Sequence, residues 1–228
     1  MGKSPLVASG RMLAAAVLAV LTSACSSLAT RVPDVNISAP RMVVMPAYVE
    51  VFELNTSGET VFRPDWQAVA ARNVETALER LIRANGARMF SEEDVGETKV
   101  RYSTFRRWTT VSMAEILDEL DGRSNADHHS VGEWRFPFKL ATWREALNAD
   151  FALVVRFWDG FQSPDLVLLN MVSPARHRGK QTGVACVLDL RDGRVVWCDR
   201  TTSGYGDLRA PADAEKAVSR LLKSLSSP

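Results

Sequence analysis

The longest strand signal in the sequence is FALVVRFW, from Phe151 to Trp158. Its residues are apolar apart from Arg156, with no alternation of apolar and polar positions. A strand of this kind is covered on both faces of its sheet, whereas a strand with one wet face alternates. The stretch therefore predicts a central strand in a sheet that carries helices.

A hairpin follows this strand. Val184–Leu190 and Val195–Asp199 are apolar runs on either side of the turn sequence LRDGR. A three-residue loop with Gly193 in the left-handed conformation would place Cys186 opposite Cys198. A two-residue loop would place them on opposite faces, because one step of register reverses every side chain. Cys186 and Cys198 are therefore a candidate disulfide, or else two small buried side chains.

The other elements have ordinary sequence signals. Apolar residues at three-and-four spacing predict a long helix that opens at Pro64–Asp65 and ends at Asn85–Gly86, and a last helix that starts at Pro211. A strand is expected between Met42 and Leu54, with Pro46 marking a bulge or an edge. A capping box at Thr142–Glu145 predicts a short helix that runs to Asn148.

Together these elements predict an α/β fold. We expect a single three-layer-like domain, with a mixed sheet, a C-terminal hairpin and packed helices. The 228 residues carry 28 Lys plus Arg against 27 Asp plus Glu, and 46% are hydrophobic. This composition is that of an ordinary globular protein, and it lacks the basic excess that favours nucleic acid as a partner.

The amino terminus has the pattern of an export signal. Lys3 and Arg11 precede an uncharged apolar run from residue 12 to 21, too short to span a bilayer. The run ends in LTSAC (Leu21–Cys25), which resembles the lipobox of bacterial lipoproteins. The resemblance implies cleavage after residue 24 and acylation of Cys25. We expect a signal peptide at 1–24, a lipidated end and tether at 25–40, and a periplasmic domain at 41–228.

Three short segments resemble one fold family. MVVMP (Met42–Pro46) precedes the long helix, NADFALV (Asn148–Val154) leads into the central strand, and VLDLRDGRVVW (Val187–Trp197) forms the hairpin. This series is similar to the α/β fold shared by the TolB amino-terminal domain and the curli-secretion-channel lipoproteins. The resemblance implies a role in assembling envelope complexes, not in catalysis.

Catalytic signals are weak. His128, His129 and Glu133 lie close together in a polar stretch, but their spacing is not that of an established zinc site, and adjacent loop histidines are usually solvated. There is no Gly-x-Ser-x-Gly elbow, and the glycine-rich Ser203–Asp207 lacks the ending of a phosphate loop. We expect no enzyme activity, no cofactor and no metal.

Two segments are candidates for a protein interface. Trp108, Trp134, Phe136 and Phe138 are interleaved with arginines, a combination enriched at binding hot spots, although they could equally cover the core. The run from Leu166 to Val172 would be core as a strand. As an exposed loop it would be a patch for a partner or for lipid, with Leu166, Leu168, Leu169 and Met171 as its candidate contacts.

The sequence therefore predicts a lipid-anchored protein of the outer membrane that faces the periplasm. It would act as a non-enzymatic structural or assembly component, joined to lipid through acylated Cys25 and to an envelope partner or a second copy. The alternatives are a periplasmic metal-binding protein or hydrolase that uses His128, His129 and Glu133, and a small-ligand module with a tryptophan-lined pocket.

Overall fold

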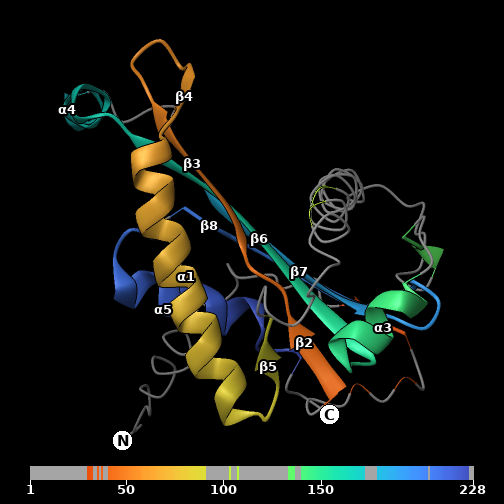
Figure 1. The fold of residues 1–228 in the computed structure, drawn as a ribbon. Helices are drawn as coiled ribbons and strands as arrows, with labels where there is room; N and C mark the ends of the chain where they lie inside the picture. The colour runs from red at the N-terminus through yellow and green to blue at the C-terminus, as the bar shows by residue number, and fades with distance from the viewer. Residues whose placement is uncertain are drawn as a thin grey trace, which may run out of the picture.

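The computed structural model describes residues 30–32, 35, 37, 41–90, 103, 107, 133–136, 140–172, 179–204 and 206–225. These residues form one eight-stranded mixed sheet with helices packed against it (Figure 1). The strands are β1 (Thr30–Arg31), β2 (Met42–Val44), β3 (Tyr48–Leu54), β4 (Thr60–Phe62), β5 (Arg88–Met89), β6 (Phe151–Gln162), β7 (Gln181–Asp189) and β8 (Val195–Ser203). The named helices are α1 (Pro64–Ala84), α3 (Ala141–Leu147), α4 (Pro164–Val172) and α5 (Pro211–Leu221). The expected α/β domain is thus confirmed.

Strand β6 is the centre of the sheet, as its apolar sequence predicts. One edge of β6 pairs antiparallel with β7 from Phe151–Asp189 to Asp159–Gln181. The other edge pairs first with β2 and then with β3, both in parallel. The interval between β2 and β3 contains Pro46, which has no amide hydrogen to donate to a ladder. A single long strand therefore has two successive partners on the same side.

Alternate residues of β6 lie in two separate cores. Leu153, Val155 and Phe157 pack in the core under α1 and α5. Ala152 and Val154 pack in a second core that contains Trp143 and Leu147 of α3. The sheet is therefore the middle of three layers, and this arrangement requires the unbroken apolar run of the central strand.

Helix α1 follows its sequence signals closely. It begins with Pro64 at its first turn and Asp65 beside it, and residues 70, 74, 77, 78 and 82 form its buried face. Its C-terminal cap is Asn85, and Gly86 takes a left-handed φ of 77°. Because such a φ strains residues with a Cβ atom, glycine is the residue that ends this helix at low cost.

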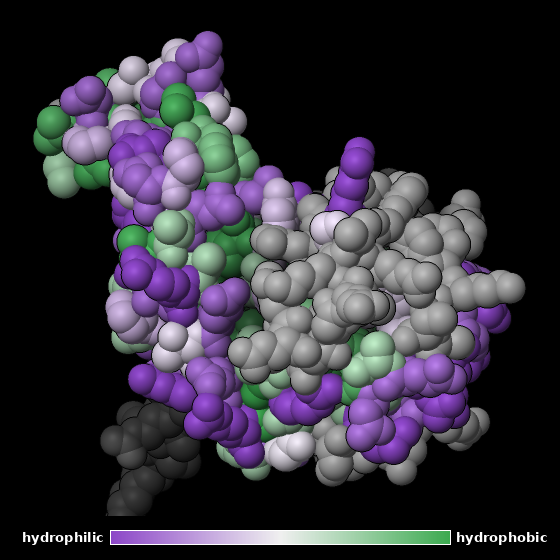
Figure 2. Space-filling view, viewed as in Figure 1, coloured by the Kyte–Doolittle hydropathy of each residue, from purple (hydrophilic) through white to green (hydrophobic). Residues whose placement is uncertain are grey.

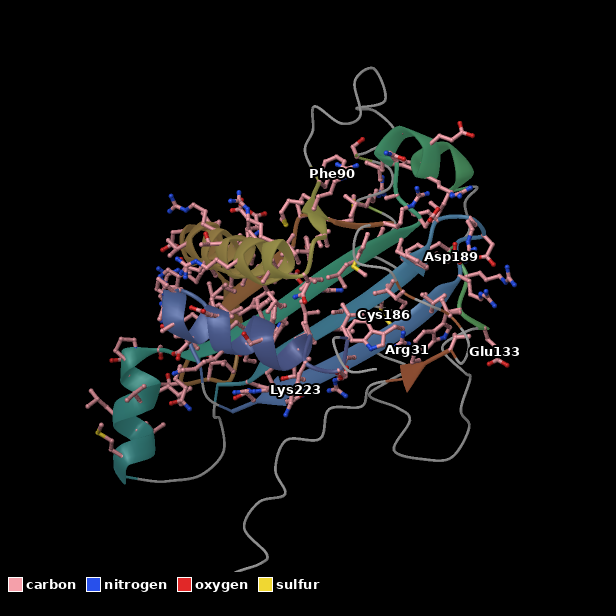
Figure 3. All side chains as sticks on the ribbon, turned by 90° about the horizontal axis from the view of Figure 1, so that it is seen from below. Arg31, Phe90, Glu133, Cys186, Asp189 and Lys223 are labelled. Carbon is pink, nitrogen blue, oxygen red and sulfur yellow. A yellow bond between two sulfur atoms is a disulfide. The ribbon has the colours of Figure 1, made fainter. Side chains whose placement is uncertain are left out.

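The β7–β8 hairpin combines a glycine turn with a bulge. Gly193 has a φ of 75° and donates its amide to the Asp189 carbonyl at 2.8 Å. The register shifts once, between Val187–Trp197 and Leu188–Val195, so that Val196 is the extra residue. With this shift, Cys186 lies opposite Cys198 at a Cα–Cα distance of 4.2 Å, and their sulfur atoms form a disulfide. Figure 3 shows Cys186 in the middle of the sheet.

Three expectations need correction. The expected tether at 25–40 contains β1, which pairs antiparallel with β8 at Cys198 and Trp197. The short middle helix starts at Ala141 and is capped by Leu140, so Thr142 is not at the cap position. The run from Leu166 to Val172 is neither a strand nor a loop, because it lies in helix α4.

The disulfide gives a testable contribution to stability. The bond joins cysteines that are 12 residues apart, and cross-linking a loop of this size contributes about 2–4 kcal/mol by restricting the unfolded chain. We expect the double variant Cys186→Ala/Cys198→Ala to lose about this much free energy of unfolding in urea titrations. A reductant should destabilise the native protein and leave the double variant unchanged. Equal sensitivity of both proteins to the reductant would contradict the assignment.

Candidate functional site

Helix α4 extends from the end of the central strand. The Ser163 amide donates to the Leu54 carbonyl at 2.8 Å, which fixes the start of α4 beside the end of β3. The Ser163 hydroxyl accepts a hydrogen bond from the Leu166 amide at 3.2 Å, as an N-cap does. Pro164 and Asp165 then occupy the first turn. These local signals explain why an apolar run that reads as a strand becomes a helix.

Most of the apolar side chains of α4 face solvent. Leu166 is 2% exposed and holds the helix against the fold. The exposed group, called here the α4 surface, consists of Val167 (38% exposed), Leu168 (63%), Leu169 (47%) and Met171 (74%). Figure 2 shows hydrophobic residues at the upper left, where Figure 1 places α4. Exposed apolar groups that gather in this way usually mark a binding surface.

Aromatic rings brace the sheet next to α4. The Phe52 ring packs between Phe62 of β4 and Trp158 of β6, with centroid distances of 5.7 and 5.5 Å. The ring of Trp66 on α1 is contacted by two arginines. The guanidinium carbons of Arg63 and Arg209 lie 3.8 and 4.1 Å from its centre. Such cation–π contacts hold long side chains in place. The end of the sheet next to α4 is therefore well packed.

Asp159 is a buried acid in β6, and sequence analysis did not single it out. The carboxylate is 1% exposed and accepts hydrogen bonds at 3.1 Å from the Gln181 side chain and from the Leu208 amide. The Leu208 carbonyl in turn accepts from Asn73 of α1 at 3.0 Å. Asp159 therefore fastens the loop before α5 to the sheet. The available signal was an acid placed directly after the apolar run at Phe151–Trp158.

Burial raises the pKa of Asp159 to about 7, from an ordinary value of 3.8. A shifted carboxyl group is often a catalytic candidate. Here both hydrogen bonds go to the protein itself, and one of them positions a backbone segment. The geometry therefore assigns Asp159 a structural role.

The opposite end of the sheet is charged. Asp150 accepts hydrogen bonds from Arg41 and Arg144 at 2.8 Å each, and these bonds lower its pKa to about 2. In the neighbouring hairpin turn, Asp189 pairs with Arg191. Figure 3 shows Asp189 far from α4, which is the teal helix at the lower left. The domain thus has exposed apolar side chains on α4 at one end and an arginine-rich hairpin at the other.

The aromatic middle segment is only partly described. Phe136 is 4% exposed and belongs to the core beside α3, and Trp134 is partly buried against the same core. Phe136 and Leu166 were candidate contact residues, and burial removes both from that role. Trp108 and Phe138 lie outside the described residues, as does Cys25.

The candidate metal loop is also largely outside the described residues. Glu133 is exposed, and His128 and His129 are not among the residues with a described position. Within the described part of the chain, no three His, Cys, Asp or Glu side chains gather as metal ligands. A pocket between α1 and α5 is lined by aliphatic side chains with Asn85, and no tryptophan contributes to it. No helix in the described segments is both long and apolar enough to cross a membrane.

Comparisons with known proteins give weak matches. No family model matches the chain, and no curated protein matches it. A variant of the PelC dodecamer from Paraburkholderia phytofirmans covers 90% of this chain and 100% of its own, with 14% identity and a TM-score of 0.44. The LpoB C-terminal domain from Salmonella enterica covers 74% and 85%, with 8% identity and a TM-score of 0.33. The lipoprotein GNA1162 from Neisseria meningitidis covers 82% and 98%, with 10% identity and a TM-score of 0.34.

These solved structures include a bacterial lipoprotein, but at such scores no conclusion about this chain follows from them. The resemblance to the TolB amino-terminal domain and to curli-secretion lipoproteins is not confirmed by these matches and stays a prediction.

The raised pKa of Asp159 predicts a pH-dependent stability. A carboxyl group with a folded pKa of about 7 and an ordinary value of 3.8 binds its proton more tightly in the folded state. The contribution of Asp159 to the free energy of unfolding is therefore complete below about pH 4 and is lost as the pH rises through 7. Asn at this position can accept the same two hydrogen bonds without a charge. We expect Asp159→Asn to be roughly 2–4 kcal/mol more stable than the native protein at pH 8, with a smaller gain at pH 5. An equal difference in the free energy of unfolding between the two proteins at pH 5 and pH 8, measured by urea titration, would contradict this.

Proposed function

We propose that this protein is a membrane-anchored periplasmic lipoprotein that acts as a non-enzymatic structural or assembly component of a cell-envelope complex. The observation that carries the proposal is LTSAC at residues 21–25, placed directly after a basic start and a short apolar run. The thiol of Cys25 is the group that would be acylated. Several acyl chains on one residue give stable anchoring, because each buried methylene contributes about 0.8 kcal/mol.

The disulfide supports the same compartment independently. Cys186 and Cys198 are bonded across the β7–β8 hairpin. Structural disulfides persist in oxidising compartments such as the periplasm and are rare in the cytosol. An exported chain with one acylated cysteine and one internal pair would use all three of its cysteines.

The proposed assembly role rests on surface chemistry. The side of the sheet that carries α3 presents the partly buried Trp134 and the exposed Arg135, and Trp and Arg are the residue types enriched at binding hot spots. We therefore propose that this side contacts an envelope protein or a second copy of the chain. The lipid contact through Cys25 and this protein contact would act together.

Acylation of Cys25 is tested by substitution. We expect Cys25→Ala to lose labelled palmitate and to leave the membrane fraction. Ser26→Asp is the matched control, since it keeps the thiol and changes only the neighbour that is usually non-acidic in outer-membrane lipoproteins. This control should remain acylated and move to the inner membrane. A Cys25→Ala protein that stays in the membrane fraction would contradict the anchoring.

The assembly role is tested by crosslinking in intact cells. A photoreactive amino acid at Trp134 should give one discrete adduct, either with an envelope protein or with a second copy. The same probe at Lys216 is the control, because Lys216 is exposed on α5, which packs on the other face of the sheet. Monomer alone from the Trp134 probe would count against an assembly role for this side.

A further inference from the structure

Helix α4 has apolar residues on its outer side as well as on its inner side. Leu168 and Met171 follow Leu166 by two and five residues, which at 3.6 residues per turn places them opposite the buried Leu166. A surface helix of a soluble domain would normally carry polar residues there. Only Asp165 and Asn170 are polar in the nine residues of α4. The exposed side of α4 is therefore suited to contact with an apolar environment.

The direction of β1 places the start of the domain near the same end. β1 is antiparallel to β8, with Thr30 opposite Cys198 and Arg31 opposite Trp197. The chain thus runs from Thr30 toward the hairpin end, so the amino-terminal side of Thr30 faces the α4 end. β8 continues from Cys198 to Ser203 in that direction, and Ser203 lies opposite Gln181.

The distance from Thr30 to Cys25 matches this geometry. Five residues of chain reach at most about 17 Å, and the five residues from Cys198 to Ser203 span about the same length in a strand. Cys25 is therefore able to reach the level of Asp159, three residues before β6 ends at Gln162 and α4 begins. Reaching the hairpin end would require the chain to turn back on itself.

The size of the α4 surface argues for lipid in preference to a protein. A stable protein interface buries about 800 Å² on each partner and uses about 20–30 residues a side. The α4 surface has four side chains. Binding to a lipid surface does not require shape complementarity, and a few apolar side chains can enter the lipid individually.

Charge near α4 selects the type of lipid. Lys180 is exposed, and its carbonyl accepts a hydrogen bond from Gly160 near the end of β6. The sequence that links α4 to β7 carries three Lys or Arg residues and no acid. Cations next to an apolar surface are attracted to anionic headgroups. At the opposite end, Arg41 and Arg191 are already paired with Asp150 and Asp189.

We propose that α4 inserts its exposed side chains into the surface of an anionic phospholipid leaflet and thereby orients the domain. The strands then stand with the α4 end at the membrane and the hairpin end away from it. This inference rests on the proposed lipid anchor, which supplies the attachment, while α4 sets the direction.

The test places a single reactive thiol on α4 of the full-length, acylated protein. Cys186 and Cys198 are bonded and Cys25 would be acylated, so Leu168→Cys or Met171→Cys adds the thiol that a polarity-sensitive fluorophore labels. Both sites are exposed, so the fold should tolerate them. Arg83→Cys is the matched control, exposed in the last turn of α1. The proteins are reconstituted in vesicles of phosphatidylethanolamine with phosphatidylglycerol.

Flotation of the vesicles reports the anchor, and quenching by an aqueous reagent reports α4. We expect the probes on α4 to be quenched about tenfold more slowly than the Arg83 probe, because moving one such apolar group out of water corresponds to at least that population ratio. Protection should be weaker in vesicles of phosphatidylcholine. Equal protection in both lipids would overturn the choice of an anionic surface.

The other outcomes separate the two proposals. A protein that floats while its α4 probes are quenched as fast as Arg83 would overturn the insertion of α4 and leave the anchor intact. Protection that disappears when the protein is diluted in excess lipid would assign α4 to a second copy and overturn the lipid contact. A protein that does not float would contradict the anchor itself, and with it the inference built on it.

Discussion

The antiparallel ladder between β6 and β7 joins the two halves of the sheet. The ladder runs from Phe151–Asp189 to Asp159–Gln181, while β2 and β3 share the other edge of β6 on either side of Pro46. Because β6 continues beyond this ladder to Gln162, the sheet has one end packed against α3 and one end that projects with α4. The α3 end and the α4 end of the domain are therefore separated by the length of this single strand.

Polar contacts then fix the helices to this sheet. Asp159 holds the Leu208 amide and Asn73 holds the Leu208 carbonyl, so one buried residue ties α1, β6 and the start of α5 together. The energetic cost of burying the Asp159 carboxylate is reduced by protonation near neutral pH. A buried acid is therefore compatible with a stable core, and it fastens the loop before α5 to the sheet.

The sequence was most informative where one signal has one structural outcome. The apolar run at Phe151–Trp158, the spacing in α1 and the glycine turn at Gly193 each specify an element, and each is present. The run from Leu166 to Val172 was ambiguous, because a short apolar stretch suits a strand or a helix, and the Ser163 cap decides it. β1 has two residues and no periodic signal. The bulge at Val196, which sets the cysteine register, depends on cross-strand packing.

We propose that this α/β domain is held at a lipid surface through acylated Cys25. The most direct measurement is mass spectrometry of the protein purified from membranes, read at its amino-terminal tryptic peptide. We expect a peptide that begins at Cys25, ends at Arg31 and carries the added mass of acyl chains. An unmodified amino terminus, or a chain that still begins at Met1, would contradict it.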